Sequence, residues 1–305
     1  MLVLMDRARR IAVTMGDTAG IGPEVTRAAL ESGRLDPDFE YHVVGDVPPG
    51  TVAGQPTKQT ARAAASALEE AARLALHHEV GAVVTGPVNK SALHAIGFPF
   101  PGQTEFFAQC CGVKDFAMIL TGGSLTVGLV SIHVPLRQAI EQLSADEIER
   151  VGRQLASFLR LRLSRDLRIG VAGLNPHAGE GGTFGREEIE VISPAIERLN
   201  RAATGASFHG PLPPDTVFHA AAHGEWDGVL CMYHDQGLIP LKLHAFDEGV
   251  NTTWGLPILR TSPDHGTAFP IAGKGIARAG SMIAALRLAA ELVRAHEHAS
   301  AGGRG

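Results

Sequence analysis

Short runs rich in β-branched residues alternate with longer amphipathic stretches along the whole chain, and this alternation constrains the fold more than any other feature. Seven runs are typical of strands, namely residues 11–15, 41–44, 82–85, 117–120, 126–132, 167–174 and 228–232. Residues 60–77 and 144–163 are typical of helices, and Ser144 is expected to cap the second. Such alternation predicts an α/β protein with a mostly parallel sheet.

Composition narrows the class of protein further. The chain has 305 residues, enough for about two domains, and 27 Lys and Arg against 32 Asp and Glu. It has no long basic run and no apolar stretch of about 18 residues, so we expect neither nucleic-acid nor membrane binding. The N-terminal residues lack the order of a secretory signal, and three cysteines without CxxC spacing indicate reduced, buried thiols. We therefore expect a cytoplasmic protein.

Three histidines stand in polar, glycine- and proline-rich segments directly after predicted strands. They are His133 in Ser-Ile-His-Val-Pro-Leu, His177 in Asn-Pro-His-Ala-Gly-Glu, and His234 in Met-Tyr-His-Asp-Gln-Gly. Parallel strands place their carboxyl ends at one edge of a sheet, where ligands bind. Three neutral imidazoles there can hold a divalent metal with a position open for substrate, whereas hydrogen-bonded loop histidines are the alternative for each residue alone.

Two glycine-rich segments are candidates for binding a nucleotide. The first predicted strand ends in Gly16-Asp17-Thr18-Ala19-Gly20-Ile21-Gly22-Pro23-Glu24, which leads into a helix. Such a turn either cradles an anion or is only a tight strand–helix connection, and the GxGxxG spacing of a Rossmann site is absent. The second segment runs from Asp264-His265-Gly266-Thr267 to Lys274-Gly275.

Polar and cationic residues follow His234 in a stretch rich in glycine and proline that we read as a loop. They are Lys242, Asn251 and Arg260. A lysine point charge and an arginine fork suit a phosphate or carboxylate, although ordinary surface charge is an equal alternative.

The combination of motifs resembles the 4-hydroxythreonine-4-phosphate dehydrogenase family of pyridoxal phosphate biosynthesis and its close paralogues. The motifs that carry the resemblance are Gly16-Asp17 to Glu24, Gly86-Pro87-Val88-Asn89-Lys90, Asn175-Pro176-His177-Ala178-Gly179-Glu180, Gly210-Pro211-Leu212-Pro213 with Asp215-Thr216, and Asp264-His265-Gly266-Thr267. The first and last also resemble turns of isocitrate and isopropylmalate dehydrogenases.

The resemblance implies two α/β/α domains of the isocitrate dehydrogenase type, with the active site in the cleft between them. It places residues 1–125 and 262–305 in a nucleotide-side domain, and residues 126–261 in a central domain with the metal site and dimer contacts. It also implies a homodimer with shared active sites, NAD or NADP as cofactor, and one divalent metal per site, zinc, cobalt or magnesium.

The resemblance assigns site residues as follows: metal ligands His133, His177 and His234; catalytic Asp215 and Lys242; substrate contacts Gln103, Thr104, Lys242, Asn251 and Arg260; cofactor contacts Asp17, Gly20, Gly22, His265, Gly266 and Ala268. Gln103 is a departure, because the family usually has histidine there. Glutamine can hydrogen-bond a substrate but cannot gain a proton near neutral pH.

The expected reaction is metal-dependent, NAD- or NADP-linked oxidation and decarboxylation of 4-phosphohydroxy-L-threonine to 3-amino-2-oxopropyl phosphate. An alternative within the family is a paralogue that acts on 4-phosphoerythronate, 4-phosphothreonate or a dihydrodiol carboxylate. Two other classes are a three-histidine metallohydrolase, which would work without NAD, and a binding protein without catalytic activity.

Overall fold

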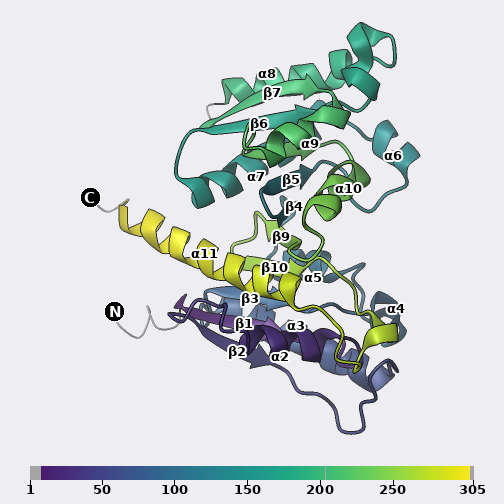
Figure 1. The fold of residues 1–305 in the computed structure, drawn as a ribbon, viewed down its shortest axis with the longest axis vertical. Helices are drawn as coiled ribbons and strands as arrows, with labels where there is room; N and C mark the ends of the chain where they lie inside the picture. The colour runs from purple at the N-terminus through teal and green to yellow at the C-terminus, as the bar shows by residue number, and fades with distance from the viewer. Residues whose placement is uncertain (1–7, 203, 303–305) are drawn as a thin grey trace. The chain divides into compact units, whose positions relative to one another are not determined.

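The chain is described from a computed structural model that covers residues 8–202 and 204–302 (Figure 1). The first residues of the N-terminal segment considered above, 1–7, lie outside this range. The chain divides into two compact units: unit 1 is Met1–Lys114 with Asp247–Gly305, and unit 2 is Asp115–Phe246. The sequence placed these boundaries later, at 125 and 261. No helix in the described residues is long and apolar enough to cross a membrane.

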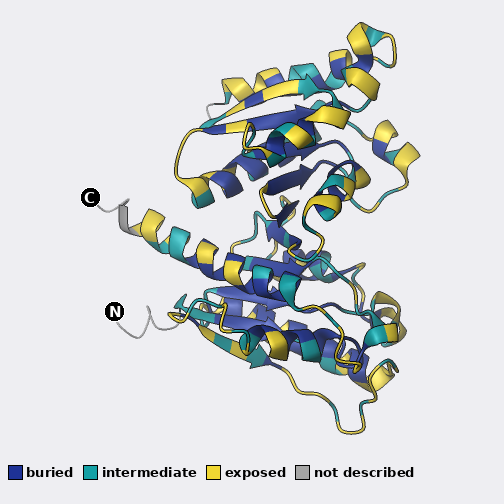
Figure 2. Cartoon of the chain, viewed as in Figure 1, coloured by how far each residue is buried: buried dark blue, intermediate teal, exposed yellow. Residues whose placement is uncertain are grey.

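Unit 1 has five strands in the order β2-β1-β3-β10-β9. Their bounds are β1 Arg10–Thr14, β2 Glu40–Val44, β3 Ala82–Thr85, β9 Val250–Trp254 and β10 Leu259–Pro263. Strands β2, β1, β3 and β10 are parallel, and β9 runs antiparallel to β10. In Figure 2 the inner strands β1, β3 and β10 are mostly dark blue, whereas the edge strand β2 is mostly exposed or intermediate.

Some helices of unit 1 pack on its sheet, and the others pack mainly on those helices. The helices are α2 Gly22–Leu30, α3 Lys58–Leu76, α4 Lys90–Ala95, α5 Gln103–Cys110 and α11 Gly280–Gly302. The alanine-rich helix α3 packs on β1 and β3, while α11 packs on β10, β3 and α2. Thr57 starts α3 with a capping box, since its side chain accepts from the Thr60 amide and the Thr60 hydroxyl accepts in return.

Unit 2 has the strand order β4-β5-β8-β6-β7. Their bounds are β4 Ala117–Gly122, β5 Leu125–Leu129, β6 Leu167–Ala172, β7 Ala206–Leu212 and β8 Gly228–Cys231. Strands β4 and β5 form an antiparallel hairpin, and β5, β8, β6 and β7 are parallel. The α/β class with mostly parallel strands is therefore confirmed.

Longer helices pack against the sheet of unit 2. Helices α7 (Ala145–Leu163) and α8 (Ser193–Arg201) also pack on each other, whereas α9 (Pro214–Ala222) and α10 (His234–Ala245) each contact β5 and β8. Three shorter helical segments, α6 Leu136–Glu141, η1 Pro176–Gly182 and the π-helix η2 Glu188–Ile192, lie in the connections. Ser144 caps α7 as predicted, by accepting from the Glu147 amide.

Two sequence-based predictions are wrong. The stretch after His234 is not one loop, because residues 234–245 form helix α10, which carries Lys242, and residues 250–254 and 259–263 pair as strands β9 and β10 around a glycine-containing turn. The glycines and prolines correctly indicated the turn, but they also made the two short strands beside it look like loop in the sequence. Among the cysteines only Cys231 is buried, whereas Cys110 is exposed at the end of α5.

Candidate functional site

The three histidine-bearing loops leave the same edge of the unit 2 sheet. Strands β5, β8 and β6 are parallel neighbours, and the segments with His133, His234 and His177 follow their carboxyl ends in that order. This arrangement is the one predicted from the sequence, because the carboxyl ends of parallel strands share one edge of a sheet.

His133 and His234 lie close together. Their ring centroids are 5.5 Å apart, and both line a cavity of about 260 Å³ together with Ser131, Tyr233 and Asp235. The backbone ties their loops, because the Ser131 amide and hydroxyl both donate to the Met232 carbonyl, at 3.2 and 3.0 Å. The fold thus places both imidazoles in the lining of the same cavity.

The tautomer of His234 suits metal ligation. Its Nδ1 is 2.7 Å from Oδ1 of Asp235. An ionised carboxylate only accepts, so in a neutral His234 ring this contact assigns the hydrogen to Nδ1 and leaves the lone pair on Nε2. A ligating histidine is commonly fixed by a carboxylate in this way.

His177 does not join this pair within one chain. It is exposed in η1, and its ring faces Phe184 at a centroid distance of 6.2 Å. Across residues 8–202 and 204–302, no group of three or more His, Cys, Asp or Glu side chains could hold a metal ion. The described chain therefore offers two of the three expected ligands as a pair, and the complete set does not assemble in it.

Gln236 connects two of these loops and was not singled out from the sequence. This buried side chain donates from Nε2 to the Gly173 carbonyl, after β6, and accepts from the Met232 amide, after β8, both at 2.7 Å. It therefore fixes the loop of His177 relative to that of His234. The available signal was its position two residues after His234 in the His-Asp-Gln-Gly segment.

The two expected catalytic residues lie on neighbouring helices of unit 2. Asp215 is exposed in the first turn of α9, and Lys242 is half-buried in the last turn of α10. Both helices contact β5 and β8, whose ends carry His133 and His234.

The expected substrate contacts of unit 1 gather around Arg260, which is only 3% exposed on β10. Its guanidinium donates to the hydroxyls of Thr253 at 2.7 Å, Thr85 at 2.8 Å and Thr104 at 3.3 Å. It also donates to Oε1 of Gln103 at 3.4 Å, and its Nε has no partner among the described residues. All four acceptors are neutral.

Burial lowers the pKa of Arg260 to about 10, and the nearby Glu105 carboxylate opposes this shift. The group is still cationic at neutral pH. A buried cation with neutral acceptors and an unpaired N–H is stabilised when an anion binds. Two of its contacts, at 3.3 and 3.4 Å, are long enough to be exchanged readily for oxygens of a phosphate or carboxylate.

Gln103 stands at the start of α5 and is held from both sides. Its Nε2 donates to the Gly86 carbonyl at 3.0 Å, while Oε1 accepts from Arg260. Asn251, on β9, is half-buried, and its Oδ1 has no partner within the described chain. The structure thus brings Gln103, Thr104 and Arg260 into one hydrogen-bonded group.

The expected cofactor residues lie in two adjoining segments of unit 1. The Ile21 amide donates to the Thr267 carbonyl at 2.9 Å, and a Cβ on Gly20 would lie 2.7 Å from the same oxygen. Gly22 likewise packs on the Met15 carbonyl. These glycines allow backbones to approach closely, and the turn's amides are used within the protein, as in a tight strand–helix connection.

The other cofactor candidates differ in exposure. Asp17 is buried, and its Oδ1 accepts from the Ala19 amide. His265 is partly exposed, with Nδ1 3.1 Å from the Gly266 carbonyl, and there is open space beside Gly266. Ala268 adopts a left-handed conformation before the short helix η3 (Phe269–Ile271).

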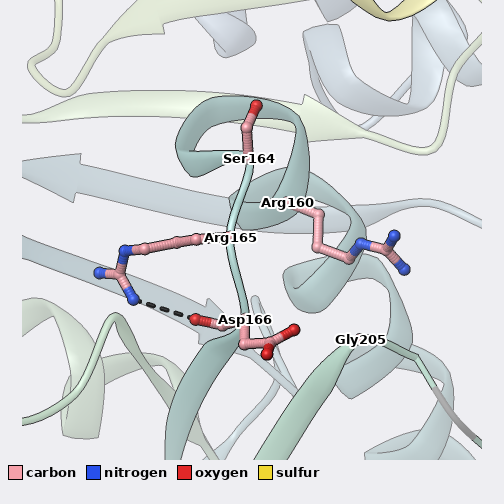
Figure 3. Close-up of a pocket in the computed structure, with 5 residues that line it drawn as sticks. All are labelled: Arg160, Ser164, Arg165, Asp166 and Gly205. Atoms are coloured by element: carbon pink, nitrogen blue, oxygen red, sulfur yellow. Dashed lines mark hydrogen bonds between the residues drawn. The ribbon is translucent and has the colours of Figure 1, made fainter.

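A larger polar hollow of about 580 Å³ contains none of these residues. It lies at the end of α7 and is lined by Arg160, Ser164, Arg165, Asp166 and Gly205 (Figure 3). Arg165 donates to the backbone carbonyl of Asp166, as Figure 3 shows. Its side chain also forms an ion pair with Asp227, so charged surface side chains account for this hollow.

The sequence model of the pyridoxal phosphate biosynthetic protein PdxA matches residues 11–289. The chain belongs to the PdxA family. It is 40% identical to 4-hydroxythreonine-4-phosphate dehydrogenase of Maricaulis maris, over 94% of this chain and 98% of that protein. It is also 40% identical to D-threonate 4-phosphate dehydrogenase of Pectobacterium atrosepticum, over 92% and 98%. The PdxA relatives are oxidoreductases, as expected from the motifs.

Solved structures agree with membership of the PdxA family. The 4-hydroxythreonine-4-phosphate dehydrogenase of Klebsiella pneumoniae has a TM-score of 0.80 and 38% identity, covering 93% of this chain and 99% of that one. A terephthalate 1,2-cis-dihydrodiol dehydrogenase of Burkholderia xenovorans has a TM-score of 0.65 and 29% identity, covering 93% and 98%. Isocitrate dehydrogenase of Methylococcus capsulatus, at 15% identity and a TM-score of 0.52 over 95% and 86%, confirms the expected fold type.

Proposed function

We propose that this PdxA family member oxidises and decarboxylates 4-phosphohydroxy-L-threonine to 3-amino-2-oxopropyl phosphate, with NAD or NADP as hydride acceptor, in pyridoxal 5′-phosphate biosynthesis. The observation that carries the proposal is Arg260, a buried guanidinium whose hydrogen-bond partners are all neutral. Such a group suits the carboxylate or phosphate of this substrate, and relatives at 40% identity are named for its oxidation.

Arg260, Gln103, Thr104 and Asn251 bind and orient the substrate in this proposal. They hold its anionic end so that the hydroxyl to be oxidised is presented to the nicotinamide. Asp215 accepts the hydroxyl proton, and Lys242 helps to stabilise the anionic substrate. Loss of hydride to the cofactor gives a β-keto acid, which then releases carbon dioxide.

His133, His234 and His177 are the proposed ligands of a divalent zinc, cobalt or magnesium ion. When bound, the ion lowers the pKa of the substrate hydroxyl and draws electron density from the keto group during decarboxylation. His234 fits the role because its Nε2 lone pair is free of the Asp235 hydrogen bond. The proposed NAD or NADP site is built on Asp17, Gly20, Gly22, His265, Gly266 and Ala268, and the open space beside Gly266 supports it.

A homodimer with shared active sites is part of the same proposal. Three large apolar side chains of the α10 segment are exposed: Ile239 by 65%, Leu243 by 89% and Phe246 by 68%. Their spacing of four and three residues gives one stripe on the helix, which a second copy can cover. We propose that the two copies together complete the three-histidine set that one chain leaves incomplete.

Leu243→Arg tests the dimer. We expect the variant to sediment as a monomer, to bind metal weakly and to lose most activity, because burying a charge in an apolar interface is costly. Ile276→Arg, at a residue of unit 1 that is 63% exposed, is the matched control and should behave like the parent chain. A dimeric, active Leu243→Arg variant excludes this stripe as the interface.

A second candidate function is oxidation of D-threonate 4-phosphate or a similar acid, such as 4-phosphoerythronate or a dihydrodiol carboxylate. Gln103 favours keeping it, because its Oε1 already accepts from Arg260 and one N–H of its amide donates to the Gly86 carbonyl, which leaves the second N–H for a substrate. An amide N–H of this kind can donate to an oxygen of any of these acids.

The deciding experiment is reduction of NAD and NADP by metal-loaded protein with each acid in turn, with carbon dioxide measured in parallel. Rapid turnover of 4-phosphohydroxy-L-threonine with release of carbon dioxide supports the main proposal. Turnover of D-threonate 4-phosphate alone supports the second candidate. Hydrolysis without NAD, or metal binding without any turnover, would indicate a metallohydrolase or a binding protein instead.

A further inference from the structure

The loop that carries His177 has an unusual backbone. Residues 177–182 all have positive φ, from 43° to 99°, and His177, Ala178 and Glu180 adopt this conformation without being glycine. L-residues with side chains avoid this region, so surrounding contacts must hold the loop. Contacts with residues outside the loop must therefore keep it in this conformation.

Glu188 supplies those contacts. It is 3% exposed at the start of the π-helix η2, and its Oε1 accepts from the Leu174 and Asn175 amides at 2.8 and 2.7 Å. Its Oε2 accepts from Nδ2 of Asn175 at 3.0 Å. The carboxylate thus binds three N–H groups directly before His177.

Glycines enclose the same carboxylate. A Cβ on Gly179 would lie 2.6 Å from Oε2 of Glu188, and one on Gly173 would lie 3.2 Å from Oε1. The loop therefore folds around the Glu188 carboxylate on both sides. A π-helix is uncommon and is often found at functional sites, and here it places this side chain.

We propose that Glu188 is the positioning residue of His177: it fixes the loop so that the imidazole can complete the metal site. This inference rests on the proposed function, in which His177 is a ligand. A carboxylate is required because all three partners are donors. A glutamine amide would turn one NH2 group toward a partner that also donates.

Co²⁺ titration of the full chain, followed by the visible absorption of the bound ion, tests the proposal in Glu188→Gln, His177→Ala and the double variant. We expect Glu188→Gln to weaken Co²⁺ binding about 10–100-fold, the range for residues that orient a ligand. In the His177→Ala background it should change binding no further, because its effect passes through His177. Glu190→Gln, an exposed neighbour paired with Arg186, is the control and should bind Co²⁺ normally.

Each result separates the two proposals. Normal Co²⁺ binding by Glu188→Gln, with weakened binding by His177→Ala, overturns the role of Glu188 and leaves the metal site intact. Normal binding by His177→Ala overturns the ligand assignment itself. An equal loss from Glu188→Gln in both backgrounds shows a general structural role and also overturns the inference.

Asn175→Ser is the second variant if Glu188→Gln does not fold. It removes one donor to Glu188 and leaves the buried carboxylate and both backbone donors in place. We expect weaker Co²⁺ binding than in the parent chain, by a smaller factor than for Glu188→Gln. Unchanged binding counts against the inference.

Discussion

Arg260 in unit 1 and the histidine loops in unit 2 are held in different ways. Arg260 is buried on a strand and bound directly by side chains of β3, α5 and β9. His133 and His177 are exposed on loops. The loop of His133 is held by Ser131, which donates to the Met232 carbonyl, and the loop of His177 is held by the buried side chains of Gln236 and Glu188. The proposed anion-binding group is thus built into one unit, whereas the proposed metal site depends on loops and on a third ligand that does not join the pair in one chain.

The largest effect is expected from the histidine side. His234→Ala should lower kcat/KM and metal affinity by more than about 100-fold, because removal of a ligand exceeds the 10–100-fold effect of its supporting residues. Phosphate binding at Arg260, measured by calorimetry, should be retained if the two sites are independent. His209→Ala, an exposed histidine of the same unit that contacts Trp226, should leave metal content unchanged. Equal metal content in His234→Ala would exclude it as a ligand.

Arg260→Lys is expected to have the next largest effect. A lysine keeps the charge but cannot hold Thr253 and Thr85 as the arginine fork does and also donate to the substrate, so we expect at least one charged hydrogen bond to the substrate to be lost. Such a bond contributes about 1.5–3 kcal/mol, which corresponds to a rise in substrate KM of roughly 10–150-fold. Metal content should not change. Arg278→Lys, at an exposed pair with Asp247, is the control, and an equal KM in both variants would contradict the assignment.

Gln103→His should give a few-fold effect that depends on pH. An imidazole titrates near pH 6.5, and the adjacent Arg260 cation should lower that value. The protonated ring attracts an anionic substrate, so kcat/KM relative to the parent should rise as pH falls through this range. Gln109→His, exposed on the same helix, should give a ratio that is constant with pH. A constant ratio for Gln103→His would place position 103 away from the substrate.

The smallest effects on activity are expected at the helix caps of the two units. Thr57→Ala and Ser144→Ala each remove a side chain that accepts from a helix amide, which should lower the free energy of unfolding by about 1 kcal/mol. Urea unfolding measures the loss, and kcat/KM should be unchanged for both. A large drop in activity for Ser144→Ala alone would show that the loops of unit 2 are sensitive to the stability of their scaffold.

Part of this result follows from the sequence alone. The alternation of strand and helix patterns determined the α/β class, and the position of each histidine after a strand determined that their loops share one edge. Both conclusions depend on local periodicity and on the direction of parallel strands, which neighbouring residues encode.

Only the tertiary structure decided how the charged and polar groups are used. The partners of Arg260 include Thr85, which is 175 residues away in the chain, and β10 was hidden from the sequence by the turn beside it. Glu188 has no local pattern that distinguishes it from surface residues, and the only signal for Gln236 is its position two residues after His234. Their roles arise because burial in the fold leaves their polar atoms only a few possible partners, and those partners lie in the loops that follow β6 and β8.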